Sequence, residues 1–256
     1  MAEEIQVNKI PTGIAGLDTA LDGGIPENNL VLIAGGAGAG KTTLSLQFLL
    51  NGARKGEKGI YISTEQTQNN ILKQAHGFGK DLPSLIAAGT LKITYINIIE
   101  EQEMFSLVFD AIKQIGPKRI VIDSLSTFSE YFTINDYVKE MLFRKGSMMN
   151  RQVTDKLIPT EISEKTIKKR MLAKLMTEIR KYNATVFLIT ELPEKTENLS
   201  SDGVSEFLAD GVFVLKSLAV GDSLSRTLEI KKMRYCNIRG GIKTYEITEN
   251  GIEIDA

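Results

Sequence analysis

Leu30-Val-Leu-Ile-Ala-Gly-Gly-Ala-Gly-Ala-Gly40-Lys41-Thr42 is the stretch of this 256-residue chain that decides the fold. It opens with an uninterrupted apolar run, which predicts a strand buried on both faces. Gly35 to Thr42 then fit the phosphate-loop pattern G-x-x-x-x-G-K-[ST], and a helix is expected over about 41–54. Strand, glycine-rich loop and helix in this order predict a site for the phosphates of a nucleotide.

Each part of this loop has a chemical task. The glycines let the backbone curl so that its N–H groups point at phosphate oxygens, and the helix N-terminus adds its dipole. Lys41 is expected to reach the β- and γ-phosphates, and the Thr42 hydroxyl to complete the coordination shell of Mg²⁺. The residues expected to bind ATP are Gly35, Gly36, Ala37, Gly38, Ala39, Gly40, Lys41, Thr42 and Thr43.

The rest of the chain alternates between strand and helix patterns. Apolar runs predict further strands at 59–63, 91–95, 119–123 and 184–190, and helical patterns lie near 68–76, 81–88, 103–114 and 166–182. This alternation predicts βαβ units and a mainly parallel sheet flanked by helices. Strands at 212–215, 227–231, 243–247 and 252–254, the last two joined by Asn250-Gly251, indicate antiparallel additions at the C-terminal end. We expect one α/β domain over 1–256, with 135–165 a mobile insertion.

Composition narrows the possible functions. The 31 basic and 32 acidic residues nearly cancel, which argues against a histone-like nucleic-acid binder or a membrane-surface protein. One cysteine, Cys236, and one histidine, His76, exclude an intramolecular disulfide and His-rich or Cys-based metal sites. No apolar run approaches the roughly 20 residues that span a bilayer, and the acidic start at Met1 lacks a signal core. We expect a cytoplasmic protein with no membrane partner.

Two carboxylates follow predicted core strands. Asp123 ends the run Ile120-Val-Ile-Asp, where a carboxylate can hold Mg²⁺ beside a phosphate loop. Glu65 follows Tyr61-Ile-Ser-Thr at the carboxyl end of another strand, where open α/β sheets place ligands. Glu65 could activate the attacking water. Its position after the strand fits equally well an acidic residue that stabilises the N-terminus of a helix.

Together these motifs resemble the RecA superfamily, and within it the KaiC-like branch. The similarity covers nearly the whole chain. It rests on the phosphate loop, on the motifs that contain Glu65 and Asp123, and on four further stretches of sequence. These are Ile10-Pro-Thr-Gly-Ile-Ala-Gly-Leu-Asp18, Gly23-Gly24 with Pro26, Glu206-Phe-Leu-Ala-Asp-Gly-Val212 and Arg226-Thr-Leu-Glu-Ile-Lys-Lys-Met-Arg234. Single-domain archaeal KaiC-like proteins and RadA paralogues have the most similar pattern, so the resemblance implies a RecA-like core.

The resemblance also implies a division of roles. Lys41, Thr42 and Asp123 would bind Mg-ATP, and Glu65 would be the catalytic base. Lys232 and Arg234 match cations that reach the nucleotide of a neighbouring subunit, which implies a homo-oligomer, a hexameric ring or similar. Without the resemblance, these two residues would be read as part of a solvated strand face.

Three departures from the family pattern bear on function. KaiC carries two such domains, and we expect one here. Gln66 stands where a second acid is common, and Tyr235-Cys236 replaces the usual Gly-Thr after Lys-x-Arg. The N-terminal DNA-binding domain and Phe-x-x-Ala element of RadA recombinases are not found, which argues against strand exchange of the usual kind.

The leading hypothesis is an ATPase that acts as an assembly-dependent switch or as an accessory factor in DNA recombination and repair. Residues 135–170 carry nine basic and five acidic residues and could contact single-stranded DNA, or could be a solvated insertion. An autokinase that phosphorylates Ser205 and a nucleotide-dependent scaffold are the alternatives. An unidentified protein partner is also compatible with the sequence.

Overall fold

The computed structural model of the chain describes residues 7–79, 81–97, 104–131, 164–192, 198–220 and 223–254. Most of the segment expected to be a mobile insertion, 135–165, lies outside these residues. The strands are β1 (Lys9–Ile10), β2 (Ile25–Pro26), β3 (Leu30–Gly35), β4 (Gly59–Ser63), β5 (Leu91–Tyr95), β6 (Arg119–Asp123), β7 (Thr185–Glu191), β8 (Gly211–Val220), β9 (Ser223–Met233), β10 (Ile242–Thr248) and β11 (Gly251–Ile254). The helices are α1 (Ala15–Ala20), α2 (Lys41–Ala53), α3 (Gln68–Gln74), α4 (Leu82–Ala87), α5 (Met104–Ile115), α6 (Leu125–Tyr131), α9 (Glu164–Arg180) and α10 (Ser205–Leu208).

The centre of the molecule is a mixed sheet with the strand order β11-β10-β9-β8-β3-β7-β6-β4-β5. The strands from β8 to β5 in this order pair in parallel, and β9, β10 and β11 continue the sheet with antiparallel pairing. This arrangement confirms the predicted fold class. β8 and β9 are longer than predicted, and the two-stranded ladder of β1 and β2 was not anticipated.

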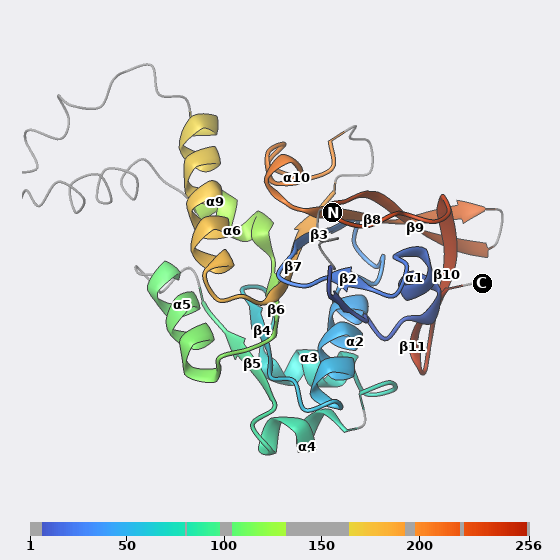
Figure 1. Cartoon of the computed structure of the whole chain (residues 1–256), viewed down its shortest axis with the longest axis horizontal. Helices are drawn as coiled ribbons and strands as arrows, with labels where there is room; N and C mark the ends of the chain where they lie inside the picture. The colour runs from blue at the N-terminus through green and yellow to red at the C-terminus, as the bar shows by residue number, and fades with distance from the viewer. Residues whose placement is uncertain are drawn as a thin grey trace, which may run out of the picture.

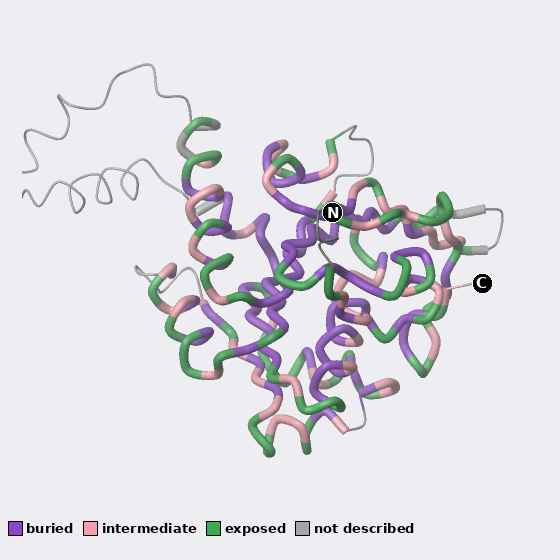
Figure 2. The backbone as a smooth tube through the Cα atoms, in the orientation of Figure 1, coloured by how far each residue is buried: buried purple, intermediate pink, exposed green. Residues whose placement is uncertain are grey.

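Helices cover both faces of the sheet, so its central strands are apolar on both sides (Figure 1). Alternate residues of β3 face opposite cores: Val31 and Ile33 pack with α1 and α2, and Leu30 and Leu32 pack with α5, α6 and α9. Figure 2 shows the result, with buried strands at the centre and exposed residues on the outer helix surfaces. In the part of the chain described, no helix has the length and apolarity needed to cross a membrane.

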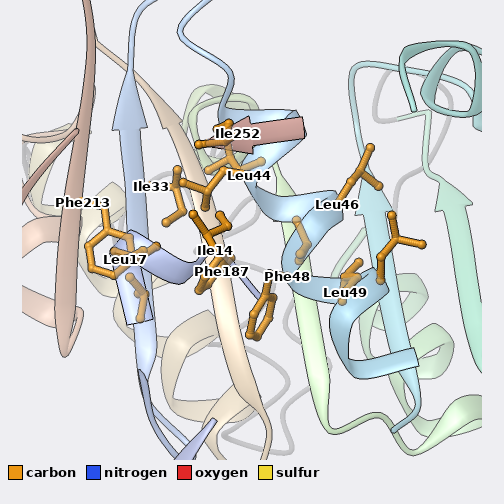
Figure 3. Close-up of a cluster of buried hydrophobic side chains, with 14 of the residues drawn as sticks. Ile14, Leu17, Ile33, Leu44, Leu46, Phe48, Leu49, Phe187, Phe213 and Ile252 are labelled. Carbon is orange, nitrogen blue, oxygen red and sulfur yellow. The ribbon is translucent and has the colours of Figure 1, made fainter. Parts of the chain in front are cut away.

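The helix after the phosphate loop is anchored by aromatic packing. Phe48 of α2 stacks on Phe187 of β7 with ring centroids 4.1 Å apart, and Phe213 of β8 meets Phe187 edge-on at 6.3 Å (Figure 3). All three rings are fully buried. Aromatic pairs of this kind add about 0.5–1.5 kcal/mol to the gain from burial, so α2 has a fixed position against the strands that end at the site.

Helix α1 begins at Ala15, with Ile14 as its N-cap residue. The Thr12 N–H and hydroxyl both donate to Asp18 Oδ1, each at 2.7 Å. Thr12 therefore organises the preceding turn and makes no cap bond of its own.

Candidate nucleotide site

The phosphate loop occupies the predicted turn between β3 and α2. Gly38 and Gly40 have φ values of 72° and 84°, a region that favours glycine. A Cβ at Gly40 would also lie 2.8 Å from Ile247 Cδ1. Conformation therefore favours glycine at Gly38 and Gly40, and a side chain at Gly40 would also have to displace the end of the Ile247 side chain. The loop leads directly into the first turn of α2.

The Lys41 ammonium group bonds to the loop that precedes it. Its Nζ donates to Gly35 O and Gly36 O, each at 2.9 Å. Burial lowers the pKa of Lys41, while the charges of Glu191, Asp123 and Glu65 act in the opposite direction. These carbonyl bonds can be exchanged for phosphate oxygens, which are stronger acceptors because they are charged.

A pocket of about 370 Å³ opens beside the loop. From the loop and α2 it is lined by Ala37, Gly38, Gly40, Lys41, Thr42 and Thr43. Three carboxylates, Glu65, Asp123 and Glu191, line it together with Gln66, Gln74, Ser124, Ile189 and Ile247. The structure thus brings most of the sequence-predicted site residues together, while Gly35, Gly36 and Ala39 belong to the loop without lining the pocket.

Asp123 lies at the carboxyl end of β6 and is 5% exposed. The Tyr61 hydroxyl donates a hydrogen bond to its Oδ2, and the same hydroxyl has Thr42 as a second side-chain partner. The pKa of Asp123 is raised to about 6, chiefly by burial; Glu65 and Glu191 also raise it, and the Tyr61 bond and Lys41 act in the opposite direction. Tyr61 thus links the two residues that were predicted to hold Mg²⁺.

The chemistry of this pair fits magnesium. Carboxylate and hydroxyl oxygens are the hard ligands that Mg²⁺ takes, usually one or two from protein and the rest from phosphates and water. No cluster of three or more His, Cys, Asp or Glu side chains suited to a metal occurs in the described ranges. Asp123 and Thr42 fit an ion that takes its other ligands from phosphate and water.

The carboxylate of Glu65 is held from one side. Ser124 Oγ and Thr127 Oγ1 both donate to Glu65 Oε1, the latter at 3.1 Å. Ser63 Oγ accepts from the backbone N–H groups of Glu65 and Gln66. Both side-chain bonds are made to the same carboxylate oxygen, Oε1.

Sequence reasoning missed Glu191. It ends β7, lines the pocket and acts electrostatically on both Lys41 and Asp123. Its backbone N–H donates to Ser126 Oγ at 2.9 Å. The signal was present, because Glu191 follows a buried parallel strand in the same way as Asp123.

The C-terminal hairpin was also missed as a part of the site. The Tyr245 hydroxyl of β10 donates to Ala39 O inside the phosphate loop, and burial raises the pKa of Tyr245 to about 12. Ile247 lines the pocket, and the Ile252 N–H donates to Gln47 Oε1 of α2 at 2.7 Å. These partners are about 205 residues apart in sequence, so no local pattern indicates them.

Lys232 and Arg234 lie away from the pocket of their own chain. Arg234 Nη1 pairs with Asp210 Oδ1 at 3.0 Å, and Asp210 Oδ2 accepts from the Leu30 N–H. Lys232 Nζ donates to Glu206 O and to Ala209 O. This cluster therefore sits at the Leu30 end of β3, and the phosphate loop follows Gly35 at the other end. The strand between them spans about 17 Å at about 3.3 Å per residue, beyond the reach of an arginine side chain.

Comparison with known proteins agrees with this geometry. The family model described as "ATPase: KaiC" matches residues 10–166 and 145–256. The circadian clock oscillator protein KaiC of Nostoc sp. is 30% identical over 259 residues, which are 97% of this chain and 44% of that protein. Its counterpart from Synechococcus elongatus is 29% identical over 264 residues, 99% of this chain and 45% of that protein. This chain thus spans less than half the length of these two relatives.

A solved structure matches the whole fold. The crystal structure of a KaiC-like protein from the hyperthermophilic archaeon Pyrococcus horikoshii superimposes with a TM-score of 0.77 at 29% identity, covering 98% of this chain and 100% of that one. Family model, sequence relatives and structure agree with one another and confirm the resemblance read from the motifs. The chain belongs to the KaiC family of ATPases.

Proposed function

We propose that this chain binds Mg-ATP and hydrolyses it to ADP and phosphate. The observation that carries the proposal is the convergence of Lys41, Thr42, Asp123 and Glu65 on one pocket beside the phosphate loop. A phosphate loop alone could bind many phosphate-containing ligands. Here the loop is accompanied by a buried carboxylate that can hold the metal, Asp123, and a second carboxylate that can activate water, Glu65. Phosphoryl transfer to water needs these groups.

Each residue has a distinct task in this proposal. The loop N–H groups and Lys41 hold the β- and γ-phosphates, and Thr42 and Asp123 hold Mg²⁺, which neutralises phosphate charge when bound. Glu65 is the general base, which orients a water and accepts its proton at Oε2 while Ser124 and Thr127 fix Oε1. Ile247 offers an apolar surface for the nucleotide base.

Catalysis is completed between subunits of a homo-oligomer, a hexameric ring or a similar assembly. Lys232 and Arg234 of one subunit supply positive charge to the γ-phosphate of the next. The supporting observation is their place at the end of β3 opposite to the phosphate loop, which excludes action on their own site. Hydrolysis then depends on assembly, because a cation supplied in trans stabilises the transition state.

In the cell, such an ATPase would act as an assembly-dependent switch or as an accessory factor in DNA recombination and repair. Support for DNA comes from the basic composition of 135–170. Of that segment only the start of α9 is described, and there Lys169 and Arg170 are exposed. A patch of this kind attracts phosphate backbones without reading sequence.

The autokinase alternative has less support. Ser205 is fully buried, and its hydroxyl donates to Asp202 Oδ2 at 2.6 Å. Glu206 beside it is also buried and accepts from Ser200. A phosphate on Ser205 would face two carboxylates and need the surrounding turn to open, and like charges at this distance repel.

The decisive measurement is the ATPase rate of size-fractionated protein, with and without single-stranded DNA. Turnover that needs Mg²⁺ and is confined to the assembled fractions is expected. The complete absence of ATP hydrolysis in every fraction, with ATP still bound, would leave a nucleotide-dependent scaffold as the better reading. Stimulation by DNA would select the accessory role over a switch independent of DNA.

A further inference from the structure

The phosphate loop is held by a side chain of the C-terminal hairpin, which packs against it from outside the pocket. The Tyr245 hydroxyl of β10 donates to Ala39 O, and both residues are buried. Ala39 directly precedes Gly40, which lines the pocket. The contact is therefore made one peptide unit away from the nucleotide site.

Helix α2 fixes the position of this hydroxyl. Gln47 of α2 accepts from the Ile252 N–H at 2.7 Å and donates from Nε2 to Ile252 O at 3.3 Å. It thus bonds to β11 through both backbone groups of one residue. In turn β11 pairs with β10, where Tyr245 lies opposite Ile254. The helix that the phosphate loop leads into therefore also holds the hairpin that carries Tyr245.

The bond from Tyr245 sets the orientation of the peptide between Ala39 and Gly40. This peptide is planar and trans, so its carbonyl oxygen and its N–H point in opposite directions. Because Ala39 O faces the Tyr245 hydroxyl, the Gly40 N–H points away from that hydroxyl. No backbone carbonyl of the described residues accepts from the Gly40 N–H. This N–H is therefore available to an acceptor that a ligand brings.

Glycine makes this orientation easy to lose. Most residues are restricted to negative φ, but glycine adopts positive and negative φ about equally well. The φ of 84° at Gly40 can therefore reverse when the peptide turns over. Ala39 O would then point where the Gly40 N–H now points. A carbonyl oxygen in that place would repel the phosphates of a nucleotide, because both carry negative charge.

We propose that Tyr245 is a positioning residue of the phosphate loop, whose hydroxyl holds the Ala39–Gly40 peptide so that the Gly40 N–H faces the β-phosphate of a bound nucleotide. Tyr245 lies outside the pocket lining and acts through this peptide alone. If the peptide turned over, the buried hydroxyl would lose its acceptor, which is costly. The inference rests on the nucleotide binding proposed above.

The chemistry of the contact supports a lasting restraint. Burial raises the pKa of Tyr245 to about 12, so the hydroxyl keeps the proton that it donates at ordinary pH. The Lys41 ammonium group also bonds to loop carbonyls, those of Gly35 and Gly36, but it lines the pocket and can move to a phosphate. The Tyr245 hydroxyl has no such alternative, so its bond persists when a nucleotide binds.

The first test removes the hydroxyl and keeps the ring. Affinities of Tyr245→Phe for Mg-ADP, Mg-pyrophosphate and AMP are measured by displacement of a fluorescent nucleotide. Affinity for Mg-ADP and for Mg-pyrophosphate should fall by about tenfold, a typical loss when a buried group loses its partner. Affinity for AMP should stay the same, because AMP has no β-phosphate. Unchanged affinity for Mg-ADP would overturn the inference.

This comparison separates positioning from a merely structural effect. Ile247 lies two residues after Tyr245, on the same face of β10, and lines the pocket. If the hydroxyl only kept the hairpin in place, the contact of Ile247 with the base would suffer. AMP would then lose affinity as much as Mg-ADP, and Mg-pyrophosphate would lose none, which would also overturn the inference. Tyr182→Phe, just before β7 at the opposite edge of the sheet, is the control and should bind all three ligands normally.

The second test observes the peptide itself. The nuclear Overhauser effect between the Ala39 Hα and the Gly40 amide proton depends on the orientation of the peptide that joins them. In nucleotide-free Tyr245→Phe its intensity should differ from that of the natural chain, and saturating Mg-ADP should restore the natural value. Equal intensities in the two nucleotide-free proteins would show that the hydroxyl does not orient the peptide.

The outcomes distinguish this inference from the proposed function. If the natural chain binds neither Mg-ATP nor Mg-ADP, nucleotide binding fails and the inference fails with it. If the natural chain binds both and Lys41→Ala does not, but Tyr245→Phe binds all ligands like the natural chain, only the inference fails.

Discussion

Ser124 Oγ donates a hydrogen bond to Glu65 Oε1, and thereby joins the residue after β6 to the carboxylate after β4. The two strands are direct neighbours in the sheet, with Ser63 opposite Asp123. The metal-binding position and the proposed base are therefore held by adjacent strand ends. Their separation is set by the sheet and does not depend on a mobile loop.

The role of Glu65 leads to the first prediction. Glu65→Gln keeps the shape and the oxygen that accepts from Ser124, and removes the basic group. ATP affinity should stay the same, and turnover should fall by about 10²–10⁴-fold, the usual contribution of a general base. Single-turnover hydrolysis and nucleotide binding measured on the same sample test this.

Glu191→Gln is the matched control for Glu65→Gln. Glu191 lines the same pocket and carries the same charge, but its side chain lacks the bonds from Ser124 and Thr127 that hold Glu65. Glu191→Gln should reduce turnover at least tenfold less than Glu65→Gln does, because Glu191 affects the reaction only through its charge. The reverse order would assign the base to Glu191.

The second prediction concerns Lys41. Lys41→Ala removes the ammonium group that now bonds to Gly35 O and Gly36 O. Affinity for Mg-ATP should fall by about 100-fold, the loss expected for charged hydrogen bonds to phosphate. Titration calorimetry measures it. Lys55→Ala, an exposed lysine just beyond the other end of α2, is the control and should bind as the natural chain does.

The third prediction follows from the pKa of Asp123, which is raised to about 6. Mg²⁺ requires the ionised carboxylate, so protons and metal compete below that pH. Affinity for Mg-ATP should be constant from pH 8 to 7 and then decline by up to about tenfold per unit well below pH 6. Binding at a series of pH values in a constant excess of Mg²⁺ tests this.

Tyr61→Phe separates this effect from protonation of the nucleotide itself. The Tyr61 hydroxyl stabilises the ionised form of Asp123, so its removal should raise the pKa of Asp123 and move the midpoint to higher pH. The titration of free ATP is the same in both experiments. Identical pH profiles for the two proteins would mean that Asp123 does not control metal binding.

The sequence predicted the parts of the fold that local patterns encode. β3, β4, β6 and β7 were found because strands buried on both faces are continuous apolar runs. Lys41 and Thr42 were found because a phosphate loop is contiguous. Glu191 was predictable from the sequence in the same way as Asp123, because each ends a buried parallel strand.

Other features could not be predicted from local patterns. The bond from Tyr245 to Ala39 and the place of Lys232 and Arg234 at the far end of β3 depend on how the last four strands order themselves beside β3. Antiparallel strands with exposed alternate residues can pair in several orders with similar burial. Only the complete sheet decides among them.

The fourth prediction tests DNA binding. Replacing Lys168, Lys169 and Arg170 together by alanine should weaken binding of labelled single-stranded DNA and leave ATP affinity unchanged. The slope of log affinity against log salt should become shallower by about 2, because about 0.7 counterions are released per contact to a single strand. Replacement of Lys55, Lys58 and Lys118, all exposed, removes equal charge elsewhere and should have little effect. If the natural chain does not bind single-stranded DNA at low salt, the DNA role is wrong and only the switch role remains.

The last prediction concerns the subunit interface. If Arg234 completes the neighbour's site, turnover per subunit should rise with protein concentration, and Arg234→Ala should reduce it. Nucleotide binding by each subunit's own loop should persist, because Arg234 lies at the opposite end of β3. Removing an arginine supplied in trans lowers phosphoryl-transfer rates by about 10³–10⁵-fold in well-studied systems. Turnover and nucleotide affinity measured across a concentration series test these expectations.

Mixing variants makes this test sharper. Glu65→Gln and Arg234→Ala proteins are each nearly inactive alone, since every interface lacks one of the two groups. In mixed assemblies some interfaces combine Glu65 of one subunit with Arg234 of the next, and these should hydrolyse ATP. With random exchange at equal amounts, about a quarter of the interfaces carry both groups, so up to about a quarter of the natural rate should return. Exchange is followed separately by energy transfer between labelled subunits. If subunits exchange and no activity returns, Arg234 acts within its own chain or only structurally, and the shared site is wrong.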